Sequence, residues 1–177
     1  MLEFVGFTST THTYCIALVF MKEETTKHYI WALKRLQWLF GKNRPQCIMS
    51  DRELETIKGV RIVFGDVRHL LCQVHVDRNV RGYAKTMRVD PTRFCSSVRR
   101  VMRSHTEEEY EERLVYFRKK WKSGVEKGLV GYVETTWFIP HKEKLVSAWS
   151  DDVRHFATRS SNRYFNSLST NLILFCN

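Results

Sequence analysis

The stretch "CIMSDRELETIKGVRIVFGDVRHLLCQVHVDRN", residues 47–79, decides the fold. Apolar runs at 46–50 and 67–75 have the length and composition of short buried strands. The segment between them, 52–64, has helical spacing. A strand, a helix and a second strand in this order favour an α/β fold in which parallel strands are neighbours. Asp51 follows the first strand directly, at the edge where such sheets hold their ligands.

The N-terminal residues extend the same alternation of strands and helices. Residues 2–7 and 13–21 are rich in β-branched and aromatic residues and predict two strands joined by a polar turn. Residues 22–40 change to a period of three and four, which predicts an amphipathic helix. The order β–β–α–β–α–β predicts a mixed sheet with helices packed on it.

The amino-acid composition changes after His75. Residues 78–103 contain eight Lys or Arg and one acid, Asp90. Such a run is often only a solvated helix face, but it also suits contact with backbone phosphates of DNA. Thr106 and Glu109 have the spacing of a capping box, and the rest up to residue 150 is mainly helical in pattern. The cations that we expect to bind DNA are Arg78, Arg81, Lys85, Arg99, Arg100 and Arg103.

Composition limits the class of protein. The 177 residues carry a net charge of +10 and a pI near 9.6, which indicates a polyanionic partner, either nucleic acid or a membrane surface. The longest apolar runs, 14–21 and 172–176, are shorter than the roughly 20 residues of a membrane helix, and no secretory signal is visible. The five cysteines are scattered without a Cys-x-x-Cys clip, which favours a reducing compartment.

Two features could carry chemistry. Asp51 is either an ordinary acid in the first turn of a helix or a ligand for a divalent cation, and magnesium chemistry needs several such acids. Cys72-x-x-His75 is either half of a tetrahedral zinc site or a buried cysteine with a hydrogen-bonded histidine at a strand end. Both pairs of alternatives stay open on residue chemistry alone.

The linear order of motifs over the first 80 residues closely resembles the Mutator-like element (MULE) transposase domain. No single motif would suffice, and the resemblance rests on their combination and order. The matching pieces are Gly6-x-Thr8, Glu24, Tyr29-x-Trp31-Ala32-Leu33, Ser50-Asp51-Arg52-Glu53, Val63-Phe64 and Leu70-Leu71-Cys72-x-x-His75-x-x-x-Asn79.

The resemblance implies an RNase H-like fold, a nuclear location, and DNA cutting and joining by an Asp-Asp-Glu set that holds Mg²⁺. Asp51 would be the second acid and a metal ligand, with Cys72 and His75 near the active site. The implied domains are a partial RNase H-like core over 1–80, a basic helical insertion over 81–150, and a truncated helix over 151–177 that returns to the core. The fold expected is therefore α/β, with an incomplete RNase H-like mixed sheet flanked by helices and a mainly helical C-terminal insertion region.

Two of the three acids have no counterpart here. The family's first Asp and its strand would precede Gly6, and Phe165 stands where the final Glu is expected, within Ser161–Ser167. No Asp or Glu follows Asp152. One carboxylate cannot position two magnesium ions, so we expect no functionally bound Mg²⁺ and no activity of this chain alone. The missing strand should leave an exposed sheet edge or a gap in the core.

The leading hypothesis is a DNA-binding, catalytically incomplete fragment of a MULE transposase. The alternative is a domesticated nuclear DNA-binding or transcription-regulatory protein resembling the plant far-red-response factors, although their zinc modules are not visible here. A third hypothesis is that the protein is a transposase that acts as part of a larger chain. Homo-oligomerisation is left open.

Overall fold

The computed structural model describes residues 1–7, 12–152 and 170–175. The chain divides into two compact units, which are described separately. Unit 1 consists of Met1–Cys72 and Val153–Asn177, and unit 2 of Gln73–Asp152. The expected boundary lay after residue 80. The division here precedes helix α3, Gln73–Thr86, because this helix packs against the helices that follow it.

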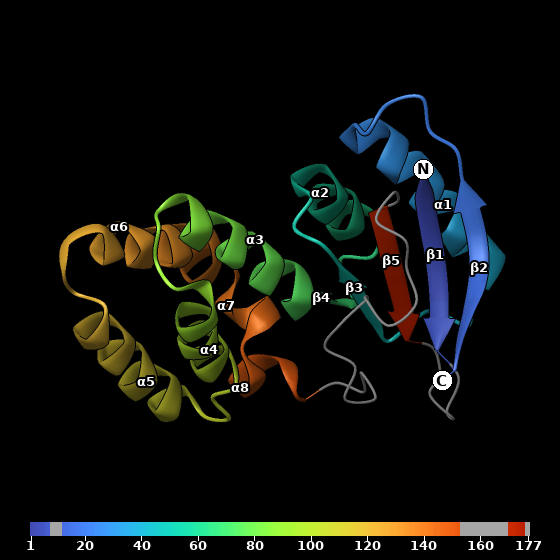
Figure 1. Ribbon diagram of the computed structural model, residues 1–177. Coiled ribbons are helices and arrows are strands. Elements are labelled where there is room, and N and C mark those ends of the chain that lie inside the picture. Colours follow the sequence, from blue (N-terminus) through green and yellow to red (C-terminus); the bar gives the residue numbers. More distant parts are fainter. Residues whose placement is uncertain (8–11, 153–169, 176–177) are drawn as a thin grey trace. The chain divides into compact units, whose positions relative to one another are not determined.

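Unit 1 is built on a mixed five-stranded sheet in the order β2-β1-β5-β3-β4 (Figure 1). Strand β1 pairs antiparallel with β2 and parallel with β5, whereas β3 pairs antiparallel with β5 and parallel with β4. The expected α/β class with a mixed sheet is therefore confirmed. The bounds of the strands are β1 Leu2–Phe7, β2 Thr13–Val19, β3 Cys47–Ser50, β4 Arg68–Leu71 and β5 Thr170–Phe175.

The central position of β5 corrects two expectations. Residues 170–175 form a strand, where we expected a helix over 151–177; residues 153–169 lie outside the described part of the chain. We also expected an exposed edge or a gap, but β5 lies between β1 and β3 and joins them. An apolar run as short as 172–175 fits a buried strand or a buried helix equally well, and pairing with two neighbours decides between them.

Helices α1, Thr26–Phe40, and α2, Leu54–Val63, cover one face of the sheet (Figure 1). The buried positions of α1 recur at helical spacing, as the sequence predicted. The two helices approach closely at Gly59, where a Cβ atom would lie 3.1 Å from Tyr29 Cβ and 3.2 Å from Leu33 Cδ1. Gly59 therefore permits this packing at some cost in helix propensity.

The structure describes all of unit 2, and every element of regular secondary structure in this unit is a helix. Its interior is aromatic, with Phe94 packed on Trp121 at 5.0 Å and on Phe117 at 5.5 Å between ring centroids. Besides α3 it contains α4 Pro91–Met102, α5 Glu107–Lys120, α6 Gly124–Val133, a π-helical turn Glu134–Phe138, α7 Ile139–Leu145 and α8 Ser147–Ser150.

The predicted capping box at the start of α5 forms in part. The Thr106 hydroxyl accepts from the Glu109 backbone N–H at 3.1 Å. The Glu109 carboxylate reaches back one residue further than expected, to the N–H of His105 at 2.6 Å. Two backbone donors are satisfied in either arrangement, so the helix begins where the sequence predicted.

The packing of β5 predicts a large effect of Leu174→Ala. The Leu174 side chain is fully buried in the core of unit 1, and its truncation should lower the free energy of unfolding by about 2–5 kcal/mol. The matched control is Leu18→Ala on β2, because Leu18 is 52% exposed and should lose less than about 1 kcal/mol. Urea titration followed by circular dichroism measures both, and equal effects would contradict the central placement of β5.

Candidate functional site

Asp51 lies where β3 ends, beside the end of its parallel neighbour β4. Its side chain is half-buried, and its Oδ1 accepts from the backbone N–H of Glu53 at 3.3 Å. Glu53 is the N-cap of α2 and accepts from the N–H of Glu55 at 3.2 Å. The carboxylate of Asp51 therefore helps to turn the chain from the strand into the helix.

Ser50 and Glu53 have the spacing of a capping box, but Ser50 does not cap α2. Its hydroxyl donates to the backbone carbonyl of Asp51 at 2.6 Å and lies 2.9 Å from His69 Nε2. A hydroxyl has one proton, so the imidazole must donate to Ser50 through Nε2. This buried bond joins β3 to β4 and fixes the backbone at Asp51. No local pattern predicts this bond, because Ser50 and His69 meet only through strand pairing.

The carboxylates around Asp51 do not fit a two-magnesium centre. Within residues 1–7, 12–152 and 170–175 there is no group of three or more His, Cys, Asp or Glu that could hold a metal. A magnesium pair is normally held by several carboxylates. The segment Ser161–Ser167, with Phe165 in place of the expected Glu, lies outside the described residues.

Cys72 and His75 fall in different units of the chain. Cys72 is buried directly after β4, and its N–H donates to the carbonyl of Ser50 at 2.8 Å. His75 is half-buried in the first turn of α3, so the expectation that both residues end a strand is wrong for His75. In the part of the chain that is described, no third Cys, His, Asp or Glu completes a metal site with them.

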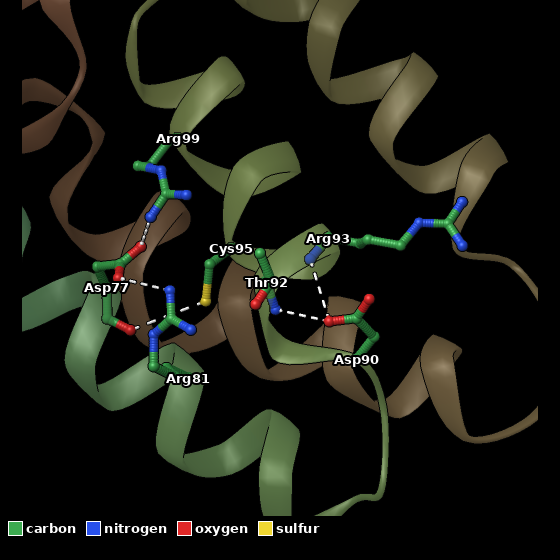
Figure 2. A network of polar contacts seen from close by, with 7 residues as sticks. All are labelled: Asp77, Arg81, Asp90, Thr92, Arg93, Cys95 and Arg99. Carbon is green, nitrogen blue, oxygen red and sulfur yellow. Dashed lines mark hydrogen bonds and ion pairs between the residues drawn. The ribbon is translucent and has the colours of Figure 1, made fainter.

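Asp77 is the centre of a charged network in unit 2 (Figure 2). Its Oδ1 forms an ion pair with Arg99 of α4, and its Oδ2 lies 3.5 Å from Nη2 of Arg81 on its own helix. Arg81 and Arg99 are two of the six cations that the sequence nominated for DNA contact. Both engage the Asp77 carboxylate and so offer less charge to a ligand, and the pair with Arg99 joins α3 to α4.

The same network includes Cys95 and the start of α4. The Cys95 thiol donates to the backbone carbonyl of Asp77 at 3.8 Å. Burial raises the pKa of this thiol, the Asp77 carboxylate raises it further, and Arg81 and Arg99 oppose the shift. Cys95 is therefore a protonated packing residue at neutral pH. Asp90 caps α4 by accepting from the N–H of Thr92 at 2.9 Å.

The other four nominated cations are exposed. Arg100 lies over the ring of Tyr116, with its guanidinium carbon 5.7 Å from the ring centroid. Residues 77–103 hold eight Lys or Arg and only two acids, Asp77 and Asp90, and Asp77 is already paired with arginines. Of the six nominated cations, the exposed ones are Arg78, Lys85, Arg100 and Arg103, here called the exposed cation set.

Fold and charge together define an α/β domain followed by a basic helical unit. Comparison with family models gives the relationship: residues 1–79 match the MULE transposase domain. This part of the chain is a MULE-family domain. A search of curated proteins returns no match. Among the described helices, none is both long and apolar enough to cross a membrane.

The network around Asp77 predicts a modest but specific loss of stability in Asp77→Asn. The substitution keeps the size of the side chain and leaves Arg81 and Arg99 without their shared counter-charge. Because all three side chains are partly exposed, we expect the free energy of unfolding to fall by about 1 kcal/mol. The matched control is Asp66→Asn, whose carboxylate is 64% exposed beside Arg44 and should change stability by less than about 0.5 kcal/mol. An equal loss in both, measured by urea unfolding, would show that the network adds nothing.

Proposed function

We propose that this protein is a nuclear DNA-binding protein of MULE transposase descent that does not cut or join DNA by itself. The observation that carries the proposal is the joining of a MULE-family domain, residues 1–79, to a helical unit with an exposed cation set. We further propose that strands β1 to β4 and their helices derive from an RNase H-like core.

Phosphate contact is the natural use of the exposed cation set. Asp77 and Asp90 are the two acids of residues 77–103, and Asp77 pairs with Arg81 and Arg99, so this part of the sequence is strongly basic. Lys and Arg at a surface bind backbone phosphates and release counterions, so the affinity depends on salt and is tolerant of sequence. A strong preference for one DNA sequence would instead favour a domesticated regulatory protein similar to the far-red-response factors.

The donor set around Asp51 supports the proposal of catalytic incompleteness. A carboxylate that caps a turn, without further acids grouped near it in the described residues, supplies too little negative charge for two divalent cations. Mg²⁺ is the ion that the family would use, and we propose that it is not functionally bound here. Asp51 keeps its structural role, which is to stabilise the turn from β3 into α2.

Charge reversal at two members of the exposed cation set tests DNA binding. Lys85→Glu with Arg103→Glu should weaken binding to a duplex probe by at least about tenfold at low salt. The slope of log affinity against log salt should fall by about 1 to 2, because each phosphate contact contributes close to one unit. Both side chains are exposed, so the fold should survive.

The matched control reverses Lys122 and Lys127, which are exposed in the same unit and change the net charge equally. If both double variants lose the same affinity, overall charge and not the cation set governs binding. Arg81 and Arg99 are unsuitable for this test because their reversal would also break the pairing with Asp77.

Catalytic incompleteness has its own test. The purified full chain, incubated with supercoiled plasmid and Mg²⁺ or Mn²⁺, should produce no nicked circles beyond a protein-free control. Asp51→Asn should leave this background unchanged. Metal-dependent nicking that Asp51→Asn abolishes would refute the proposal, since Asp51 would then be a working ligand.

A further inference from the structure

Helix α4 has a basic face that is separate from the Asp77 network. Its exposed members, at successive spacings of three, four and three residues, are Arg93, Ser96, Arg100 and Arg103. Residues at these spacings lie along one side of a helix. Arg99 pairs with Asp77, whereas Figure 2 shows the Arg93 side chain pointing away from that carboxylate. Residues 91–103 contain no Asp or Glu, so this side of α4 is purely cationic and polar.

Lys120 of α5 extends this face onto the neighbouring helix. Its ammonium group donates to the Ser97 hydroxyl at 3.1 Å and lies 5.3 Å from the ring centroid of Trp121. The Ser97 hydroxyl in turn donates to the backbone carbonyl of Arg93 at 3.2 Å, one turn earlier in α4. The ammonium of Lys120 is therefore held beside α4 by uncharged groups.

Arg100 is held in a comparable way by α5. Its guanidinium carbon lies 5.7 Å from the ring centroid of Tyr116, which is one turn before Lys120 in α5. Ser97 and Arg100 are three residues apart in α4, which is roughly 5 Å along the helix axis. The two cations that α4 and α5 hold together are therefore close neighbours on one surface.

Uncharged partners distinguish Arg100 and Lys120 from the other cations of unit 2 that are held in place. An ion pair offsets the charge of the cation, whereas a ring or a hydroxyl restricts its position and leaves its charge. A side chain that is already restricted loses less rotamer freedom when it binds an anion. The arginines that pair with acids are Arg81 and Arg99 with Asp77, Arg113 with Glu109, and Arg118 with Glu134.

We propose that DNA binds unit 2 at the face formed by Arg93, Arg100, Arg103 and Lys120, here called the α4–α5 face. The inference rests on the proposed function and adds Arg93 and Lys120 to the cations that contact DNA. Arg100 and Lys120 are its anchors, because they combine full charge with a restricted position. Their targets are neighbouring phosphates of one strand, which carry no sequence information.

Two double variants of equal charge test the α4–α5 face. Arg100→Gln with Lys120→Gln removes the two anchors, and Arg78→Gln with Lys85→Gln removes two exposed cations of α3. The anchor variant should bind a duplex probe at least about tenfold more weakly at low salt, with a salt slope lower by about 2. The α3 variant should lose less than about threefold. Fluorescence anisotropy measures the affinities, and circular dichroism checks that both variants are folded.

The outcomes separate this inference from the proposed function. If the wild-type protein binds DNA and the α3 variant loses as much affinity as the anchor variant, the α4–α5 face is wrong while DNA binding stands. If the wild-type protein shows no salt-dependent binding of the duplex, the proposed function itself fails.

Glu112 gives a readout in the opposite direction, without disturbing either anchor. It is exposed and lies one turn before Tyr116 on the same side of α5. Glu112→Gln removes negative charge beside the α4–α5 face and should tighten DNA binding about twofold to threefold. The matched control is Glu111→Gln, which is also exposed but is rotated by about 100° around the helix. Equal tightening in both variants, or none with Glu112→Gln, would contradict the placement of DNA on this face.

Discussion

The pairing of β5 with β1 and β3 holds unit 1 together. Each flanking pair of strands has only one internal ladder, and a two-stranded hairpin or a short parallel pair is marginal in water. β5 supplies hydrogen bonds to both and fills the core between them. Among the described strands, the sheet is thus continuous only through β5.

In unit 2, the Asp77 carboxylate has a comparable structural role, because it offsets part of the positive charge of the arginines. A helix pair with this many arginines would repel itself if every guanidinium faced solvent. One carboxylate shared by Arg81 and Arg99 turns part of that charge into a link between α3 and α4. Other cations stay on the surface, so the arginines that pair with Asp77 differ from the cations that we propose to bind DNA.

Asp51 has a structural role at the edge of the sheet where the sequence predicted a metal ligand. The hydrogen bonds of Ser50 with His69 and with the carbonyl of Asp51 fix the chain at the end of β3. The carboxylate then caps the turn into α2. These contacts need no metal, and they explain why this segment can fold in a protein that we propose to be catalytically incomplete.

The sequence by itself determined β1 to β4, the helices α1 and α2, the change to a basic helical region and the MULE relationship. These follow from periodicity and motif order, which are local properties. Tertiary structure alone decided that residues 170–175 form a strand, that Ser50 bonds His69, and that Asp77 pairs with Arg99. In each case the partners are far apart in sequence, so no local pattern encodes the contact; strand pairing or helix packing brings them together.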